Sequence, residues 1–249
     1  MSSLPPQQPS FSDHMRYHWA RSQGTLSLII IYVCVAFYLA VILLKLLGVL
    51  RGPHAWLYFG LSYPGIFHNG WVHQFVTSPF LHRDLLHLVF NMLALWMFGP
   101  YLEGIFGRRR YVIFSLICAA SAMAGFLLFS AITGERSAAL GYSGVIFGIF
   151  TAAAVIEPNA PVYVFYFFCL KRKHAVYLFC AMEFLLVVAP EDHGVAHIGH
   201  LAGALAAYLF MRGRQLWQTA RTRMQARTKR RARRKRLKRP DTDQTPWKL

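Results

Sequence analysis

The fold is decided by the stretch Leu26-Ser-Leu-Ile-Ile-Ile-Tyr-Val-Cys-Val-Ala-Phe-Tyr-Leu-Ala-Val-Ile-Leu-Leu44, whose nineteen residues include no charged side chain. A helix rises about 1.5 Å per residue, so a helix of this length crosses the hydrocarbon core of a bilayer. The whole chain is 55% hydrophobic and only 15% charged, whereas a soluble domain has about 25% charged residues. The composition therefore excludes disorder for most of the chain and an ordinary soluble fold, and it predicts an all-α membrane protein.

Five further apolar segments follow this first one. Pro158 and Pro161 end the fourth span, and the apolar run after them is only nine residues long, too short to cross. The basic cluster 171–173 would cost about 2.5–3.5 kcal/mol per residue at mid-bilayer, so the fifth span is predicted to begin after it. The six predicted transmembrane helices cover residues 26–44, 85–106, 111–132, 138–156, 174–189 and 195–211.

Basic residues set the predicted orientation. The cluster 108–110 lies between spans two and three, and the cluster 171–173 lies between spans four and five. With six spans, both loops and both termini share one side of the membrane. Because cytoplasmic loops carry an excess of Lys and Arg, that side is predicted to be the cytoplasm.

The predicted domain organisation has three parts. Residues 1–24 form a short polar cytoplasmic segment, residues 25–212 the six-span bundle, and residues 213–249 a basic cytoplasmic tail, disordered or associated with the membrane. Of the 27 Lys and Arg residues in the chain, 15 lie within residues 212–249. Directly after a span, such a tail is predicted to contact anionic lipid rather than to bind nucleic acid specifically.

Four polar residues stand out inside the predicted spans: His87, Asn91, Ser143 and His200. Spans two, four and six all start on the outer side, so His87, Ser143 and His200 are expected roughly 4–10 Å below the outer surface. Asn91 lies one turn below His87 on the same helix face. Polar groups in a membrane are costly and indicate function, so we expect these four to converge on one site.

The residue types in this layer suit nucleophilic catalysis. A serine becomes a nucleophile when a base takes its proton, and histidine is the usual base. The negative oxygen that forms on a carbonyl needs fixed donors, and an Asn amide, a His N–H and a backbone N–H can serve. Ser143 and His200 are therefore the candidate nucleophile and base, and His87 and Asn91 the candidate oxyanion donors.

Small residues favour His200 over His197 as the base. From His200, the residues three, four and seven positions later are Gly203, Ala204 and Ala207, so its helix face is small throughout. Small faces let two membrane helices approach closely, which a Ser–His hydrogen bond between spans four and six requires. His197 is predicted to be structural, hydrogen-bonded to a loop or to water.

Three elements in order along the chain resemble the rhomboid family of intramembrane serine proteases. They are Trp71-Val-His-Gln-Phe-Val-Thr-Ser-Pro-Phe-Leu-His-Arg-Asp-Leu-Leu-His87-Leu-Val-Phe-Asn91, Gly141-Tyr-Ser-Gly144 and Ala196-His-Ile-Gly-His-Leu-Ala-Gly203. The resemblance implies a six-helix rhomboid-like bundle with a Ser–His dyad and no aspartate. It also implies a structural hydrogen bond for Glu103 and packing of Phe147 against the base.

The resemblance further implies the roles of the site residues and the partners. Ser143 would be the nucleophile and His200 the base, with His87, Asn91 and the Ser143 backbone N–H as oxyanion donors. No metal or other cofactor is expected. The expected partners are transmembrane protein substrates and the lipid bilayer, and the expected location is a bacterial cytoplasmic membrane, which the chain would cross several times.

Three other functions are weighed against the protease. A rhomboid-like pseudoprotease would bind membrane partners without cutting them, but both members of the dyad are present. A histidine-rich metalloenzyme could use His193, His197 and His200 near Glu191 and Asp192, yet the clustered carboxylates of an iron pair are missing. A transporter would have no need of the serine, and the sequence contains no internal repeat.

The remaining polar residues receive structural interpretations. Ser27, Ser115, Ser121 and Ser130 are expected to bond the carbonyl four residues earlier in their own helices. Three further histidines at or outside the interface are also taken as structural: His68, His73 and His82. Glu183 in span five is expected either to pair with a polar group in the bundle or to stay protonated, with no catalytic role.

Overall fold

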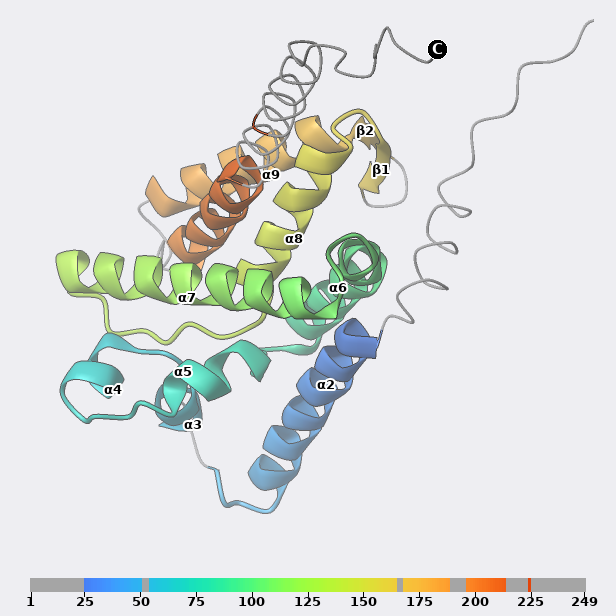
Figure 1. The fold of residues 1–249 in the computed structure, drawn as a ribbon. Helices are drawn as coiled ribbons and strands as arrows, with labels where there is room; N and C mark the ends of the chain where they lie inside the picture. Colours follow the sequence, from blue (N-terminus) through green and yellow to red (C-terminus); the bar gives the residue numbers. More distant parts are fainter. Residues whose placement is uncertain (1–24, 51–53, 165–167, 189–195, 214–223, 225–249) are drawn as a thin grey trace, which may run out of the picture. The chain divides into compact units, whose positions relative to one another are not determined.

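The computed structural model describes residues 25–50, 54–164, 168–188, 196–213 and 224, and Figure 1 traces the others in grey. The structure divides into two units, Met1–Tyr208 and Leu209–Leu249. In the second unit, residues 209–213 and 224 are helical. The predicted polar segment 1–24 and nearly all of the predicted basic tail lie outside the described residues. The candidate site belongs to the first unit.

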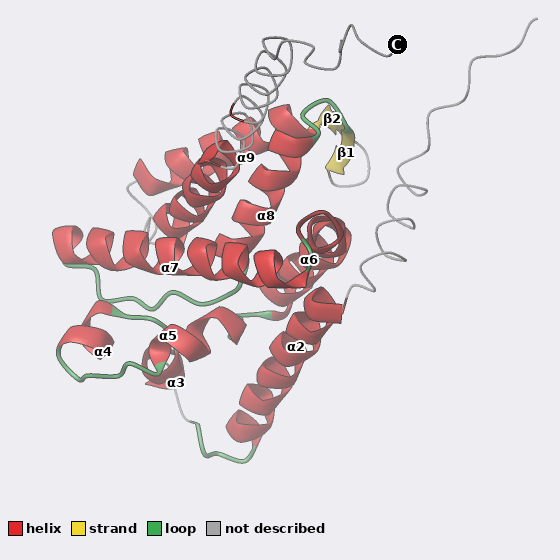
Figure 2. Ribbon diagram, viewed as in Figure 1, coloured by secondary structure: helices red, strands yellow, loops and turns green. Residues whose placement is uncertain are grey.

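Helices make up most of the described structure (Figure 2). Those at the predicted spans are α2 (Thr25–Leu46), α6 (Leu85–Phe106), α7 (Arg108–Thr133), α8 (Ser143–Ile156), α9 (Arg172–Val188) and a helix over residues 196–213. Among the described residues, α2, α6 and α7 are long and apolar enough to cross a membrane. The protein is therefore an integral membrane protein built mainly of helices.

The fourth helix begins later than the sequence predicted. Its expected start was residue 138, but α8 starts at Ser143. Residues before it form a loop in which Gly141 has φ +110°, a conformation that residues with a side chain rarely adopt. Hydropathy detects the absence of charge in this segment but not the turn, so the predicted start was wrong by five residues.

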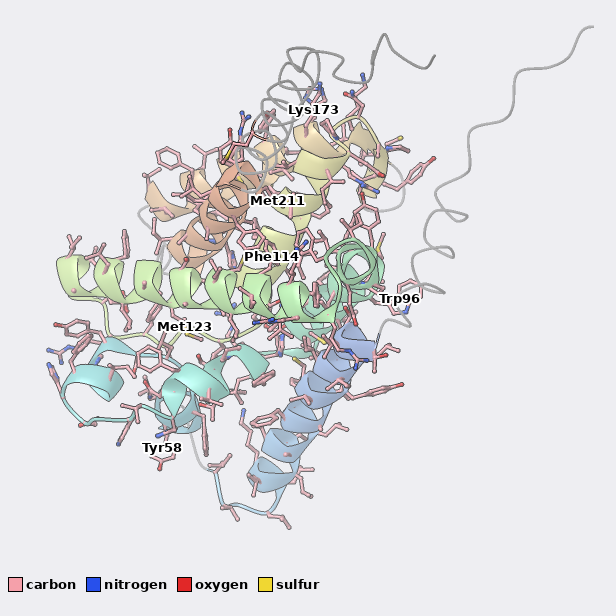
Figure 3. All side chains as sticks on the ribbon, in the orientation of Figure 1. Tyr58, Trp96, Phe114, Met123, Lys173 and Met211 are labelled. Atoms are coloured by element: carbon pink, nitrogen blue, oxygen red, sulfur yellow. The ribbon has the colours of Figure 1, made fainter. Side chains whose placement is uncertain are left out.

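A short hairpin occupies the apolar run that was judged too short to span. Strands β1 (Pro161–Val164) and β2 (Phe168–Lys171) pair antiparallel, with Val162 opposite Leu170. The following helix α9 begins at Arg172, inside the basic cluster. Figure 3 shows Lys173, in the first turn of α9, and Tyr58, on the segment between α2 and α6, at opposite ends of the described bundle.

The segment between α2 and α6 folds into four short helices: α3 (His54–Phe59), α4 (Tyr63–Phe67), α5 (Gln74–Thr77) and the 3-10 helix η1 (Ser78–Phe80). The buried Gln74 side chain holds them together. Its Nε2 donates to the carbonyls of Leu57 and Tyr58 at 2.7 and 3.1 Å, and its Oε1 accepts from the Ser62 N–H at 3.0 Å. One side chain thus bonds three backbone groups from two parts of the segment.

This segment also holds the loop that precedes α8. Leu61 and Ala139 exchange two backbone hydrogen bonds, of 3.0 and 2.8 Å, as an isolated antiparallel bridge. The Gly141 N–H donates to the Ser78 carbonyl at 2.9 Å. Hydrogen bonds from residues more than sixty positions earlier in the sequence therefore hold the loop that leads into α8.

Helix α6 packs against α2, α7 and α8 (Figure 1). Its Glu103 is buried, and its carboxylate accepts hydrogen bonds from the Leu26 N–H, the Ser27 N–H and the Ser27 hydroxyl, each at 3.2 Å. Glu103 thereby caps the start of α2 from a neighbouring helix. The carbonyl that Ser27 was expected to bond, four residues earlier, lies outside the described residues. Within them, the Ser27 hydroxyl bonds Glu103 and the Tyr111 hydroxyl.

Helix α8 meets the last helix backbone to backbone. A methyl group on Gly203 would overlap the carbonyl of Gly144, and a Cβ on Gly148 would lie 3.3 Å from the Gly203 carbonyl. Ala204 and Ala207, on the same small face, are buried. The close approach predicted from the small-residue pattern is therefore present in the structure.

This contact leads to a stability prediction for Gly203→Ala. The added methyl group must push the last helix away from α8, and overpacking of this kind costs about 1–3 kcal/mol. We expect a lower midpoint of thermal unfolding for the protein in detergent micelles. Gly213→Ala is the matched control, because a Cβ at Gly213 has no neighbour within 4 Å among the residues that the structure describes. Equal midpoints for the two variants would contradict the packing argument.

Candidate active site

Ser143 stands at the first position of α8, directly after the turn at Gly141. The first N–H groups of a helix have no carbonyl partner within that helix. The backbone N–H of Ser143 is therefore available at the point where its own hydroxyl emerges. The helix dipole adds partial positive charge there, which favours a negative group.

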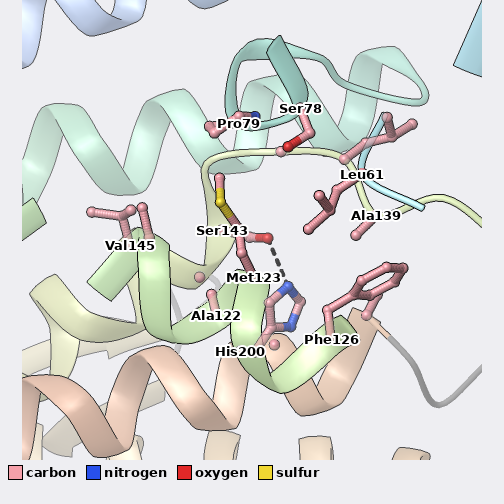
Figure 4. A pocket seen from close by; sticks show the side chains of 16 residues that line it. Leu61, Ser78, Pro79, Ala122, Met123, Phe126, Ala139, Ser143, Val145 and His200 are labelled. Atoms are coloured by element: carbon pink, nitrogen blue, oxygen red, sulfur yellow. Dashed lines mark hydrogen bonds between the residues drawn. The ribbon is translucent and has the colours of Figure 1, made fainter. Parts of the chain in front are cut away.

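His200 lies opposite Ser143 on the last helix. Its Nε2 is 2.6 Å from the Ser143 Oγ, drawn as the dashed line in Figure 4, although the two residues are 57 positions apart. The ring of Phe147, one turn along α8, stacks on the His200 ring with 4.7 Å between centroids and 6° between planes. The hydrogen bond and the stacked ring together fix the imidazole in position.

His87, near the start of α6, borders the same point. A Cβ at Gly141 would lie 3.0 Å from the His87 Nε2 and 3.7 Å from the Ser143 Oγ, so both groups flank this glycine. The neighbouring His82 ring is 5.1 Å from that of His87. His82 lies outside the helices, and burial lowers its pKa to about 4, so it is neutral near pH 7.

Asn91 is buried one turn further along α6. Its Nδ2 donates to the backbone carbonyl of His87 at 2.8 Å. An amide nitrogen carries two protons, so one N–H remains beyond this bond. The structure thus brings Ser143, His200 and His87 together and places Asn91 one turn away, on the helix that carries His87.

Glu183 of α9 pairs with polar groups of the bundle, which is one of the two outcomes expected for it, but its position beside the candidate base was not predicted. Its Oε2 lies 2.9 Å from the Nδ1 of His200 and 2.6 Å from the Nδ1 of His197. His197 therefore bonds a carboxylate instead of the loop or water that was expected. A carboxylate inside a membrane helix is itself a signal of function, but the sequence does not reveal which side chain it faces.

A small pocket of about 60 Å³ opens beside the Ser143–His200 pair. Its lining combines Ser78 and Gly141 with apolar side chains that include Met123, Phe126 and Leu61, and Figure 4 shows the labelled side chains around Ser143 and His200. The Ser143 hydroxyl therefore lies beside a mainly apolar wall. Of the alternative metal cluster, His197 and His200 are described, whereas His193, Glu191 and Asp192 lie outside the described residues.

The family model for the Rhomboid domain matches residues 69–214, more than half of the chain. The chain belongs to the rhomboid family. The resemblance noted in the sequence is thereby confirmed. Helices α6, α7, α8 and α9, with Ser143, His200, His87, Asn91 and Glu183, all lie within the matched region.

Individual relatives are distant. Rhomboid-like protein 15 of Arabidopsis thaliana is 26% identical over 152 residues, which are 57% of this chain and 36% of the relative. Rhomboid protease GlpG of Yersinia pestis is 27% identical over 160 residues, 64% of this chain and 52% of the relative. The chain thus spans about half or less of the length of these relatives. The name of the second relative describes that protein as a rhomboid protease.

Proposed function

We propose that this rhomboid is an intramembrane serine endopeptidase that cleaves transmembrane segments of other proteins through Ser143 and His200. The observation that carries the proposal is the 2.6 Å contact between the Ser143 Oγ and the His200 Nε2. A nucleophile and a base within hydrogen-bond reach are the signature of covalent acyl transfer. Rhomboid membership and the apolar pocket beside the hydroxyl support the same reaction and the same class of substrate.

The proposed reaction has two stages. His200 Nε2 accepts the Ser143 proton while the Oγ attacks the peptide carbonyl, and the imidazolium then gives that proton to the leaving amine. An acyl-enzyme and a free amine result. Water next attacks the ester, with His200 again as base, and releases the carboxylic acid and the serine. Neither stage requires a metal or another cofactor.

The oxyanion donors proposed for both stages are the Ser143 N–H, the His87 ring and the second N–H of Asn91. The start of α8 directs a backbone N–H and the positive end of a helix dipole toward the reacting carbon. The His87 ring and the Ser143 hydroxyl both lie beside Gly141. Asn91 lies one turn after His87 on α6. One of its two amide protons bonds the His87 carbonyl, and the other would donate to the oxyanion.

The wider architecture is proposed on the same basis. Helices at all six predicted positions would cross the membrane, including α8 and α9, with both termini in the cytoplasm. The basic residues at the start of α9 would face the cytoplasm, and the short helices α3 to α5 the outer interface. The same proposal includes the domain limits, which are residues 1–24, 25–212 and 213–249. It also includes contact of the basic tail with anionic lipid and a location in the bacterial cytoplasmic membrane.

The central test is removal of the nucleophile and the base. We expect Ser143→Ala and His200→Ala each to lose cleavage of a model transmembrane substrate by several orders of magnitude, with unfolding midpoints near that of the parent protein. The double variant should be little worse than either single one, because the two residues act as a unit. Turnover is measured in detergent or in liposomes.

Labelling of Ser143 by a fluorophosphonate gives an independent readout of the same test. The parent protein should label, and Ser143→Ala should not. Turnover that persists in Ser143→Ala would reject the mechanism. An unaltered protein that neither labels nor cleaves would instead point to a pseudoprotease that binds membrane partners.

Asn91→Ala tests the oxyanion proposal. Loss of one such donor lowers kcat by about 100–1,000-fold where it has been measured, and a smaller loss is expected here because two donors remain. Labelling of Ser143 by the fluorophosphonate should persist, because the amide does not activate the serine. A parental kcat would reduce Asn91 to a packing group, and complete loss of labelling would show that it only holds the dyad in place.

A further inference from the structure

We infer that Glu183 is a positioning residue for the base, so that the catalytic unit of this chain is Ser143–His200–Glu183 rather than a dyad. The inference rests on the proposed function. It goes beyond it, because the Ser–His dyad implied by the rhomboid resemblance includes no carboxylate. The observation behind it is that one oxygen of Glu183 bonds the nitrogen of His200 on the side of the ring away from Ser143.

The geometry places the three groups in series. The Ser143 Oγ is 2.6 Å from the His200 Nε2, and the His200 Nδ1 is 2.9 Å from the Glu183 Oε2. The Glu183 and His200 side chains are 13% and 18% exposed, so both are largely withdrawn from solvent. Three helices, α8, the last helix and α9, supply one member each.

The chemical consequence concerns the tautomer of His200. An ionised carboxylate only accepts hydrogen bonds, so the His200 Nδ1 must carry a proton and donate it to Glu183. The Nε2 is then left with the lone pair that faces the Ser143 hydroxyl, as a general base requires. When His200 takes the serine proton, the carboxylate stabilises the imidazolium that forms. Phe147 fixes the plane of the ring, and Glu183 fixes which nitrogen is basic.

The same carboxylate also bonds His197, at 2.6 Å from its Nδ1. Glu183 therefore could act in two ways: through His200 on the chemistry, or through His197 on the packing of α9 against the last helix. The two roles differ in which histidine matters. This difference provides the matched control, because His197→Ala removes one partner of Glu183 and leaves the other.

A bound metal is the other chemistry that these three residues could serve, since their ligand atoms lie within 4.8 Å of one another. Ligands at about 2.0–2.1 Å from a tetrahedral zinc lie roughly 3.3 Å apart. The carboxylate oxygen is closer than that to both nitrogens, at 2.6 and 2.9 Å. These are the distances of N–H···O hydrogen bonds, so the geometry favours the hydrogen-bonded unit.

The test is the steady-state kinetics of Glu183→Gln in the full-length protein, with a model transmembrane substrate. The amide keeps the shape of the side chain but can donate to the His200 Nδ1 and so favour the wrong tautomer. We expect kcat to fall by at least 100-fold, toward the roughly 10⁴-fold effect of the corresponding change in a Ser-His-Asp protease. KM should stay within about threefold, and the unfolding midpoint should be unchanged.

Two companion variants separate the chemical role from a structural one. Glu183→Asp keeps the carboxylate on a shorter side chain, so its kcat should be at least tenfold higher than that of Glu183→Gln. His197→Ala should retain kcat within about tenfold of the parent protein, because the bond between Glu183 and His200 remains. Ser143→Ala is included in every series, so that only turnover dependent on Ser143 is counted.

Two results would overturn the inference while leaving the proposed function standing, each with Ser143-dependent turnover in the parent protein. They are a Glu183→Gln kcat within threefold of the parent value and a His197→Ala loss as large as that of Glu183→Gln. Loss of parental activity on treatment with a chelator would contradict both the inference and the metal-free reaction. Absence of Ser143-dependent turnover from the parent protein would reject the proposed function itself, and the inference with it.

Discussion

The close contact of α8 with the last helix is the constraint on which the candidate site depends. It allows a hydrogen bond to join Ser143 to His200 across two helices, and it exists because Gly203 lies so near the Gly144 carbonyl that a side chain there has no room. The other features of the site each hold one end of this bond. The turn at Gly141 orients the Ser143 hydroxyl. The stacked Phe147 ring and the hydrogen bond to Glu183 hold the His200 imidazole in place. A membrane bundle cannot use the hydrophobic effect to press its helices together, so close packing of small residues has to supply that contact.

Much of this arrangement could be predicted from sequence. The limits of α6 were predicted to the residue, because a long apolar segment in a chain of this composition is typical of a membrane helix. The pairing of Ser143 with His200 followed from two facts: both are polar residues at similar depth, and both lie on small faces. The rhomboid family could also be recognised, since its motifs combine residue types whose spacing along each helix is fixed by chemistry.

What could not be predicted depends on backbone conformation or on how one helix is rotated toward another. Hydropathy averages over a window, so it missed the turn at Gly141 and placed the start of α8 too early. It also gives no rotation for α9, and Glu183 therefore had no partner until the structure placed His197 and His200 beside it. The contact of Ser27 with Glu103, 76 positions away on another helix, was likewise not predicted. Contacts across a bundle follow from the sequence only where depth and small faces both indicate them, as for Ser143 and His200.

The isolated bridge between Leu61 and Ala139 has a mechanical consequence. Its two backbone hydrogen bonds, with a third from Gly141 to Ser78, tie the segment between α2 and α6 to the residues just before Ser143. Because this linkage contains no flexible side chain, the position of that segment sets the position of the turn from which the Ser143 hydroxyl emerges.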